Sequence, residues 1–425
     1  MVLHHQNGTI LASAALLGLT LFGTRANAVP ESVVAAVDAN DATALEALSK
    51  SAPTAEQRGL AAGALLALRH EDADTIATLI PLTASATSSV VRATAYLVLS
   101  DVYCRNQHYH SCYSAIRTAS QLSAQSVNSS YRQTMGFAQA LMDEKPMQLV
   151  REATDSLPIT EERAGMIRVT IDIDGHQRGV MVDTGASFST ISASVAKSSR
   201  IHMLSKAASV GSSTERAVAV RLGLARQLQV GNTVLENVVF IVVPDSAWGI
   251  PRSFRISAII GMPVLMALGR LELVNSGAPT LRYDSRRAQH ASQAGVHSNL
   301  LLSSLEPLVL VRVPGARVPL RMELDTGSNI TTFTRNARAD APVLFAQAKR
   351  YTWRAAGMGG VVTEHRALRL PEVPLTIGGR TIIMRNVVVS SQESATSDGV
   401  IGEDVFRQGA RWTMDFKAMA LAVSN

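Results

Sequence analysis

Residues 180–187 read Val-Met-Val-Asp-Thr-Gly-Ala-Ser, and residues 322–329 read Met-Glu-Leu-Asp-Thr-Gly-Ser-Asn. In each copy an apolar segment ends in Asp-Thr-Gly, a pattern typical of a strand that runs into a tight turn. Each copy is followed by an apolar pair and a glycine, 78 residues after the first Asp and 77 after the second (261 − 183 and 402 − 325). The near-equal spacing predicts a duplicated unit that supplies a pair of carboxylates, Asp183 and Asp325.

The composition of the 425-residue chain is that of a globular protein, with 47% hydrophobic and 17% charged residues. Its length predicts two or three domains. The net charge of +6 would suit an anionic partner, but Lys and Arg are scattered, and an aromatic content of 4% leaves few side chains on which bases could stack. We therefore interpret the charge as a solvated surface and expect no nucleic-acid partner.

Residues 1–28 have the pattern of a signal peptide. Residues 10–23 are an apolar stretch, and Ala26-Asn27-Ala28 fits the small-residue cleavage pattern. The stretch before Ile10 lacks Lys and Arg, so an uncleaved anchor is the alternative. No later segment reaches the roughly 18 apolar residues of a spanning helix. The sequence predicts an exported protein, periplasmic or secreted, with no stable membrane span in the mature chain.

Residues 29–160 are expected to form an α-helical hairpin domain. The region is rich in Ala and Leu, and its apolar residues recur at intervals of three and four. Helices are predicted over 42–50, 55–69, 71–81, 88–104, 109–123 and 127–142. Residues 93–123 loosely resemble tetratricopeptide-type hairpins, without a regular period. Two interpretations stay open: a scaffold for a protein partner or substrate, and a packed spacer.

Cys104 and Cys112 flank the predicted turn of that hairpin and are the only cysteines of the chain. They fall at the end of one helix and the start of the next, where antiparallel packing brings α-carbons into bridging range, and an exported protein would keep the bond oxidised. We predict a disulfide, with free thiols as the second interpretation. A zinc site with His108 and His110 is a distant third, because the spacing is unlike common structural sites.

After Leu157-Pro158, apolar residues alternate with polar ones, the period of half-buried strands. Hairpins are predicted over residues 167–182 and 308–324, each leading into one Asp-Thr-Gly. Further hairpins with glycine-bearing turns are predicted over 228–235 and 375–382. Two β-rich lobes of similar size are therefore expected, at residues 161–292 and 293–425.

These residues resemble the aspartic peptidases, whose half-site signature is Asp-Thr-Gly after an apolar strand with a downstream apolar-apolar-Gly. The resemblance covers roughly residues 165–425. The motif at Asp183 is similar to the retroviral form and the motif at Asp325 to the pepsin form. The resemblance implies a bacterial-type single chain with two retropepsin-like lobes, a pseudo-twofold β acid-protease fold behind the helical domain. No pepsin-type flap tyrosine is found; the candidate flap residues are Val210, Gly211 and Ser212, and Gly357, Met358 and Gly359.

Two carboxylates that share one water cannot both ionise cheaply, so they hold one proton between them. The ionised member takes a proton from the attacking water, and the protonated member donates a hydrogen bond to the carbonyl oxygen of the substrate. This chemistry needs no metal or cofactor, and with both half-sites in one chain it needs no dimer. The resemblance implies that Thr184 and Thr326 tie the two loops together, and that the small Gly185 and Gly327 permit close approach of the backbone.

Ala186, Ser187 and Ser328 complete the expected support of the carboxylates. A hydroxyl at the position of Ser328 is expected to donate a hydrogen bond to the adjacent carboxylate, which lowers the pKa of the pair. Ala186 lacks that donor, so a mildly acidic pH optimum is expected unless Ser187 replaces it. The sequence predicts an aspartic endopeptidase that binds extended polypeptide between two lobes. The alternative is a catalytically silent peptide-binding pseudoprotease whose helical domain recruits a partner.

Overall fold

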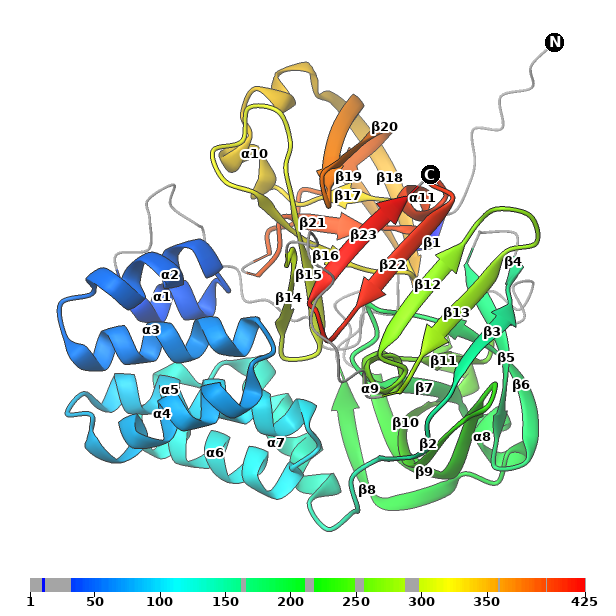
Figure 1. The fold of residues 1–425 in the computed structure, drawn as a ribbon, viewed down its shortest axis with the longest axis horizontal. Helices are drawn as coiled ribbons and strands as arrows, with labels where there is room; N and C mark the ends of the chain where they lie inside the picture. The colour runs from blue at the N-terminus through cyan, green and yellow to red at the C-terminus, as the bar shows by residue number, and fades with distance from the viewer. Residues whose placement is uncertain are drawn as a thin grey trace.

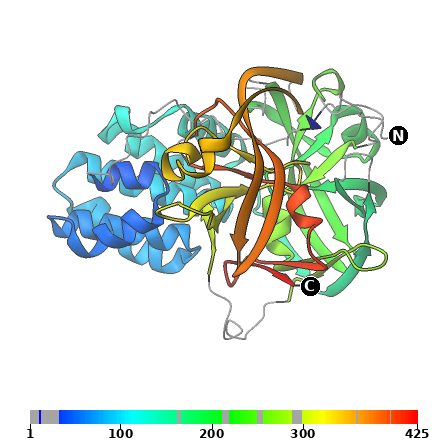
Figure 2. The ribbon, with the colours of Figure 1, turned by 90° about the horizontal axis from the view of Figure 1, so that it is seen from above.

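The computed structural model describes residues 10–11, 32–161, 166–210, 218–248, 256–286, 298–357, 360–394 and 396–424. A helical region lies on one side of the molecule and a β-rich region on the other (Figures 1 and 2). Apart from the two-residue strand at Ile10–Leu11, the helical region precedes the β-rich region along the chain, as the sequence predicted. Across the described ranges, every helix is too short or too polar to cross a lipid bilayer.

Polar N-cap residues begin most helices of the helical region. Ser32, Asp41, Thr54, Ser88 and Asn128 each accept a hydrogen bond from the backbone N–H three residues further on, which satisfies a donor that the first helical turn leaves unpaired. The helices are α1 (Val33–Asp38), α2 (Ala42–Ser51), α3 (Ala55–Leu68), α4 (Asp72–Ser85), α5 (Ser89–Arg105), α6 (Tyr109–Leu122), the 3₁₀ turn η1 (Ala124–Ser126) and α7 (Ser129–Leu141).

Helix α4 is longer than its predicted range, which ended at Pro81. A proline lacks the N–H of one helical hydrogen bond, yet α4 continues to Ser85. Its neighbour α3 presents glycines at the contact: a Cβ on Gly63 would lie 2.3 Å from Cδ2 of Leu79, and one on Gly59 would lie 3.2 Å from Cδ1 of Leu82. This close packing on both sides of the proline offsets the missing hydrogen bond.

Cys104, near the end of α5, and Cys112, in α6, form a disulfide across the turn between the two helices, with their Cα atoms 5.2 Å apart. Both cysteines are buried. The structure thus contains the pairing that the sequence analysis expected.

The β region begins earlier than the change of sequence pattern at Leu157-Pro158. Strands β2 (Gln148–Arg151) and β3 (Thr154–Pro158) already pair with strands of the first and third sheets. They are short, and β2 is largely exposed, so no alternation of buried and exposed positions marks it in the sequence.

The first sheet has the strand order β2-β10-β7-β11-β6-β5-β9-β8, with β4 beside β5. An additional pairing of β9 with β10 closes part of it into a barrel. Its further strands are β4 (Thr160–Glu161), β5 (Ile167–Ile173), β6 (His176–Val182), β7 (Ser189–Ser192), β8 (His202–Val210), β9 (Val218–Val230), β10 (Thr233–Val243) and β11 (Ala258–Ile260). The same part of the chain contains the short helices α8 (Ala193–Ser198), η2 (Asp245–Ala247) and α9 (Met262–Ala267).

The second sheet has the order β1-β18-β19-β20-β17-β21-β16-β15-β14. Its pairings repeat those of the first: β15–β16 corresponds to the hairpin β5–β6, the parallel pair β16–β21 to β6–β11, and the parallel pair β17–β20 to β7–β10. Its strands are β1 (Ile10–Leu11), β14 (Leu300–Ser303), β15 (Glu306–Val311), β16 (Leu320–Leu324), β17 (Thr332–Phe333), β18 (Lys349–Gly357), β19 (Gly360–Ile377), β20 (Arg380–Val389) and β21 (Gly399–Ile401). The same part of the chain contains the short helices α10 (Ala337–Asp340), η4 (Leu344–Gln347) and α11 (Glu403–Phe406).

A third sheet, in the order β23-β22-β12-β13-β3, joins the two parts of the β region. It combines β12 (Arg270–Val274) and β13 (Thr280–Asp284) with β22 (Arg411–Asp415) and β23 (Ala420–Ser424). Strand β12 pairs with β22 over five residues, from Arg270 with Asp415 to Val274 with Arg411.

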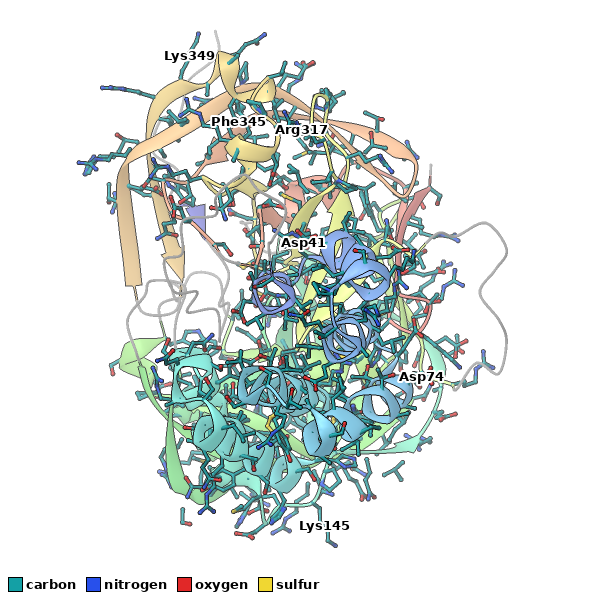
Figure 3. All side chains as sticks on the ribbon, turned by 90° about the vertical axis from the view of Figure 1, so that its left-hand side faces the viewer. Asp41, Asp74, Lys145, Arg317, Phe345 and Lys349 are labelled. Carbon is teal, nitrogen blue, oxygen red and sulfur yellow. A yellow bond between two sulfur atoms is a disulfide. The ribbon has the colours of Figure 1, made fainter. Side chains whose placement is uncertain are left out.

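The helical region packs on β14 and β15. Leu301 and Leu308 belong to the same buried apolar cluster as Leu45 of α2 and Leu60 of α3. Polar contacts add to this interface: the side chain of Asn40 donates a hydrogen bond to Oγ of Ser303 at 2.8 Å. Figure 3 looks onto this side of the molecule, where the helices lie in front of the strands.

Candidate active site

Asp183 and Asp325 each follow a strand that is held by a parallel neighbour. The backbone N–H of Asp183, directly after β6, donates to the carbonyl of Ile260 in β11 at 3.1 Å. The N–H of Asp325, directly after β16, donates to the carbonyl of Ile401 in β21 at 3.0 Å. Both residues are buried, with exposed fractions of 0% and 2%. The downstream apolar-apolar-Gly segments therefore fix the position of each Asp.

Two threonines connect the loops by reciprocal hydrogen bonds. The hydroxyl of Thr184 donates to the carbonyl of Leu324 at 2.6 Å and accepts the N–H of Thr326 at 3.0 Å. The hydroxyl of Thr326 donates to the carbonyl of Val182 at 2.8 Å and accepts the N–H of Thr184 at 3.1 Å. Both threonines are fully buried. These four bonds hold together two segments that lie 142 residues apart in the chain.

Each carboxyl group lies against the glycine of the opposite loop. A Cβ built on Gly185 would lie 2.6 Å from Cγ of Asp325, and one on Gly327 would lie 2.5 Å from Cγ of Asp183. A side chain at either position would collide with the facing carboxyl group. The two Asp-Thr-Gly segments predicted from the sequence are thus brought together in one buried place, and their glycines make this approach possible.

Backbone N–H groups of the following residues support both carboxylates. Oδ1 of Asp183 accepts the N–H of Gly185 at 2.9 Å. Oδ1 of Asp325 accepts the N–H of Gly327 at 2.9 Å and also that of Ser328 at 3.1 Å. Hydrogen bonds of this kind favour the ionised form of a carboxyl group.

The hydroxyl of Ser328 has a different partner from the one expected. It donates to the carbonyl of Ile330 at 2.9 Å, which uses its only proton. Ala186 donates its N–H to the backbone carbonyl of Asp183 at 3.3 Å, and Ser187 is half-exposed beside it. The Ser328 hydroxyl therefore donates to a backbone carbonyl and not to the carboxylate of Asp325.

Two glutamates that the sequence reasoning did not single out lie beside Asp325. Glu323 is two residues before it on β16, so both side chains project to the same side of the strand. Glu323 pairs with Leu308 on β15, which makes Glu306 its diagonal neighbour on that face. The position equivalent to Glu323 in the first copy is Met181, and this exchange of an apolar residue for an acid is the signal that could have revealed it.

Both glutamates are half-buried, and their carboxyl groups are desolvated. Burial raises the pKa of Glu306 to about 7. Burial also raises the pKa of Glu323 well above its usual value, and the negative charges of Glu306, Asp325 and Asp183 raise it further. The two glutamates thus retain protons at pH values where exposed carboxylates have lost them.

The predicted flap residues fall mostly outside the described part of the chain. Val210 and Gly357 are the last residues of β8 and β18, and Gly211, Ser212, Met358 and Gly359 lie beyond the described residues. Within the described ranges, His, Cys, Asp and Glu side chains form no group of three or more that could hold a metal ion.

Residues 169–264 match the model of a family described as aspartyl protease. The matched segment begins in β5 and ends in α9, and it contains Asp183 together with the Ile259-Ile260-Gly261 run. A search of curated proteins gave no match. Residues 169–264 are thus similar to the aspartyl proteases, which supports a member of that family and suggests peptide hydrolysis as its general activity.

Proposed function

We propose that the protein is an aspartic endopeptidase in which Asp183 and Asp325 act as one catalytic dyad. The observation that carries the proposal is the reciprocal hydrogen bonding of Thr184 and Thr326, which holds the two carboxyl groups against each other's loops. A buried pair of adjacent carboxyl groups shares a proton over the working pH range.

In this mechanism the water molecule between the carboxyl groups attacks the carbonyl carbon of the peptide bond. In one assignment of the pair, Asp325 is the ionised member, its carboxylate accepting backbone N–H groups of Gly327 and Ser328, and it takes a proton from the water. Asp183 is the protonated member and donates its hydrogen bond to the carbonyl oxygen, on which negative charge develops. The proton held by Asp325 then passes to the leaving nitrogen as the C–N bond breaks.

The repeated strand pairings of the first and second sheets support a description as two retropepsin-like lobes related by a pseudo-twofold axis. An extended polypeptide would lie between the lobes and pair its backbone with the proposed flaps at residues 210–212 and 357–359. Pairing of this kind binds the main chain, while pockets for alternate side chains set specificity.

We further propose that the protein is exported and acts in the periplasm or outside the cell. The disulfide between Cys104 and Cys112 supports an oxidising compartment, because such bonds rarely persist in the cytosol. The helical region is the proposed site for recruiting the polypeptide substrate or a protein partner. The dyad is complete within one chain, so activity is proposed not to require a dimer.

The test is incubation of the purified chain with a denatured protein mixture, with and without pepstatin, followed by mass mapping of the cut sites. Asp183→Asn and Asp325→Asn are the test variants, and Asp74→Asn, an exposed residue of α4, is the matched control. The peptidase is supported if the wild type and the control make pepstatin-sensitive cuts and both test variants fail to make them. Peptide binding without any cleavage would instead identify a pseudoprotease.

A further inference from the structure

A cavity of about 490 Å³ lies between the helical region and the β region. Its size is within the range of small-molecule and side-chain pockets. One wall is formed by α1, α3, α5 and α7, and the opposite wall by Ser187, Phe188 and residues 302–306. The cavity exists only because the helices pack on β14 and β15, so it belongs to the assembled two-region protein.

The cavity adjoins the loop that carries Asp183. Ser187 and Phe188, four and five residues after Asp183, line the cavity directly. The ring of Phe188 packs on the ring of Phe137 in α7, with centroids 4.3 Å apart. A group bound in the cavity would therefore lie next to the catalytic loop, at the side where the helical region meets it.

The cavity lining has more negative than positive groups. Among the described residues of the lining, the acids are Asp38 of α1, Asp101 of α5 and Glu306 of β15, and the one basic side chain is Arg105. Arg105 is itself paired with Asp72, with Nε 3.2 Å from a carboxylate oxygen, and its charge also acts on Asp101.

The acids of the cavity receive few hydrogen bonds. Asp101 accepts one from the hydroxyl of Tyr131 at 3.1 Å. The carboxyl group of Glu306 makes no hydrogen bond or ion pair with the residues that the structure describes, although its backbone pairs with Ser303 in the sheet. A desolvated carboxyl group without a partner is costly to ionise, and a cation that enters the cavity would remove that cost.

We propose that this cavity is a subsite that takes one basic side chain, Lys or Arg, of the polypeptide substrate, with Asp101 and Glu306 as its recognition residues. The inference rests on the proposed peptidase function, because it treats the bound group as part of the substrate. It makes the helical region a determinant of specificity.

The recognition residues also predict how binding depends on pH. Burial raises the pKa of Asp101 to about 6, opposed by the hydrogen bond from Tyr131 and the charge of Arg105. Burial raises the pKa of Glu306 to about 7; its acidic neighbour on the β side is Glu323, which in turn interacts with Asp325 and Asp183, and Asp38 is the third acid of the cavity. The cation binds the ionised forms, so its binding releases protons and strengthens as the pH rises through 6 and 7.

The first experiment maps the cut sites of the wild type, Asp101→Asn and Glu306→Gln in a denatured protein mixture. The matched controls are Asp74→Asn, an exposed residue labelled in Figure 3, and Glu372→Gln, an exposed residue of β19. We expect Lys and Arg to be enriched at one fixed distance from the cut. Each test variant should lower that enrichment about tenfold or more, the usual effect of a hydrogen bond to a charged group, and the controls should keep it. Cleavage without any preference for a basic residue would overturn the inference and leave the peptidase intact.

The second experiment measures binding and does not depend on cleavage. Fluorescence anisotropy measures the binding of labelled peptides to the full-length Asp183→Asn variant at pH 5.5 and 7.5. The peptides form pairs that are identical except at one position, which is Lys in one member and norleucine in the other. The Lys peptides should bind more tightly than their norleucine partners, with a larger difference at the higher pH. Combining Glu306→Gln with Asp183→Asn should reduce the difference in affinity between the Lys and norleucine peptides. If the wild type cleaves nothing but this discrimination is present, the peptidase fails while the subsite stands; equal binding of all pairs at both pH values overturns the subsite.

Discussion

Replacement of Thr184 by valine tests whether the hydrogen bonds between the loops hold the dyad in place. Valine keeps the shape of the side chain but removes the hydroxyl that donates to Leu324 and accepts from Thr326. Two buried backbone groups would then lose their partner. Each unsatisfied buried group costs about 1–3 kcal/mol, so the expected loss in the free energy of unfolding is about 2–6 kcal/mol.

Urea unfolding followed by tryptophan fluorescence measures this loss. The three tryptophans, Trp248, Trp353 and Trp412, all lie outside the helical region, so the signal reports the β region alone. The matched control is Thr170→Val, because Thr170 is an exposed residue of β5, and an exposed substitution of this kind changes stability by less than about 0.5 kcal/mol. The free-energy change follows from the shift of the midpoint at constant m-value.

The same variant should lose activity. If the loops separate by about 1 Å, misplacement of the carboxyl groups lowers kcat/KM on the order of 100-fold. A stability change within about 0.5 kcal/mol of Thr170→Val, together with unchanged kcat/KM, would refute the view that the threonine bonds position the dyad.

Three further predictions follow from the site and the helical region. Asp183→Asn and Asp325→Asn should each abolish cleavage, and the double variant should be no worse, because residues that act as a unit are non-additive; substantial kcat/KM in one single variant would contradict the dyad. Burial raises the pKa of Glu306 from 4.5 to about 7, so the folded protein holds a proton that the unfolded chain releases, and stability should fall as the pH rises through this range. In Glu306→Gln, the urea midpoint should fall less steeply with rising pH than in the wild type. An unchanged dependence of the midpoint on pH would argue against Glu306 as the titrating group. Replacing Cys104 and Cys112 by serine should destabilise the helical region by about 2–3 kcal/mol, seen as an earlier loss of circular dichroism at 222 nm; an unchanged transition would rule this out.

The sequence predicted most helices because their apolar residues recur with the helical period and polar residues precede them. Helix α1 was not predicted, since six residues are too few to establish a period. Helix α4 was ended at Pro81 because nothing in the sequence reveals that Gly59 and Gly63 let α3 pack closely against it. The proximity of Asp183 and Asp325 was predictable because their surroundings are duplicated.

The surroundings of the dyad were less accessible to sequence reasoning. The relation of Glu306 to Glu323 depends on the register of β15 against β16, which one-residue shifts would change. The partner of the Ser328 hydroxyl depends on the path of the chain after Gly327, which places the carbonyl of Ile330 within reach. The cavity depends on how two regions dock, and sequence periodicity carries no information about such contacts.

The third sheet has a consequence for how the protein can be divided. Strands β12, β13 and β3 come from the part of the chain before residue 287, and β22 and β23 from the part after residue 297. Their five-residue pairing joins the two parts without relying on the covalent connection between them. Two separately synthesised fragments, broken between residues 287 and 297, should therefore complement each other and restore one functional particle, as subunits of a heterodimer do.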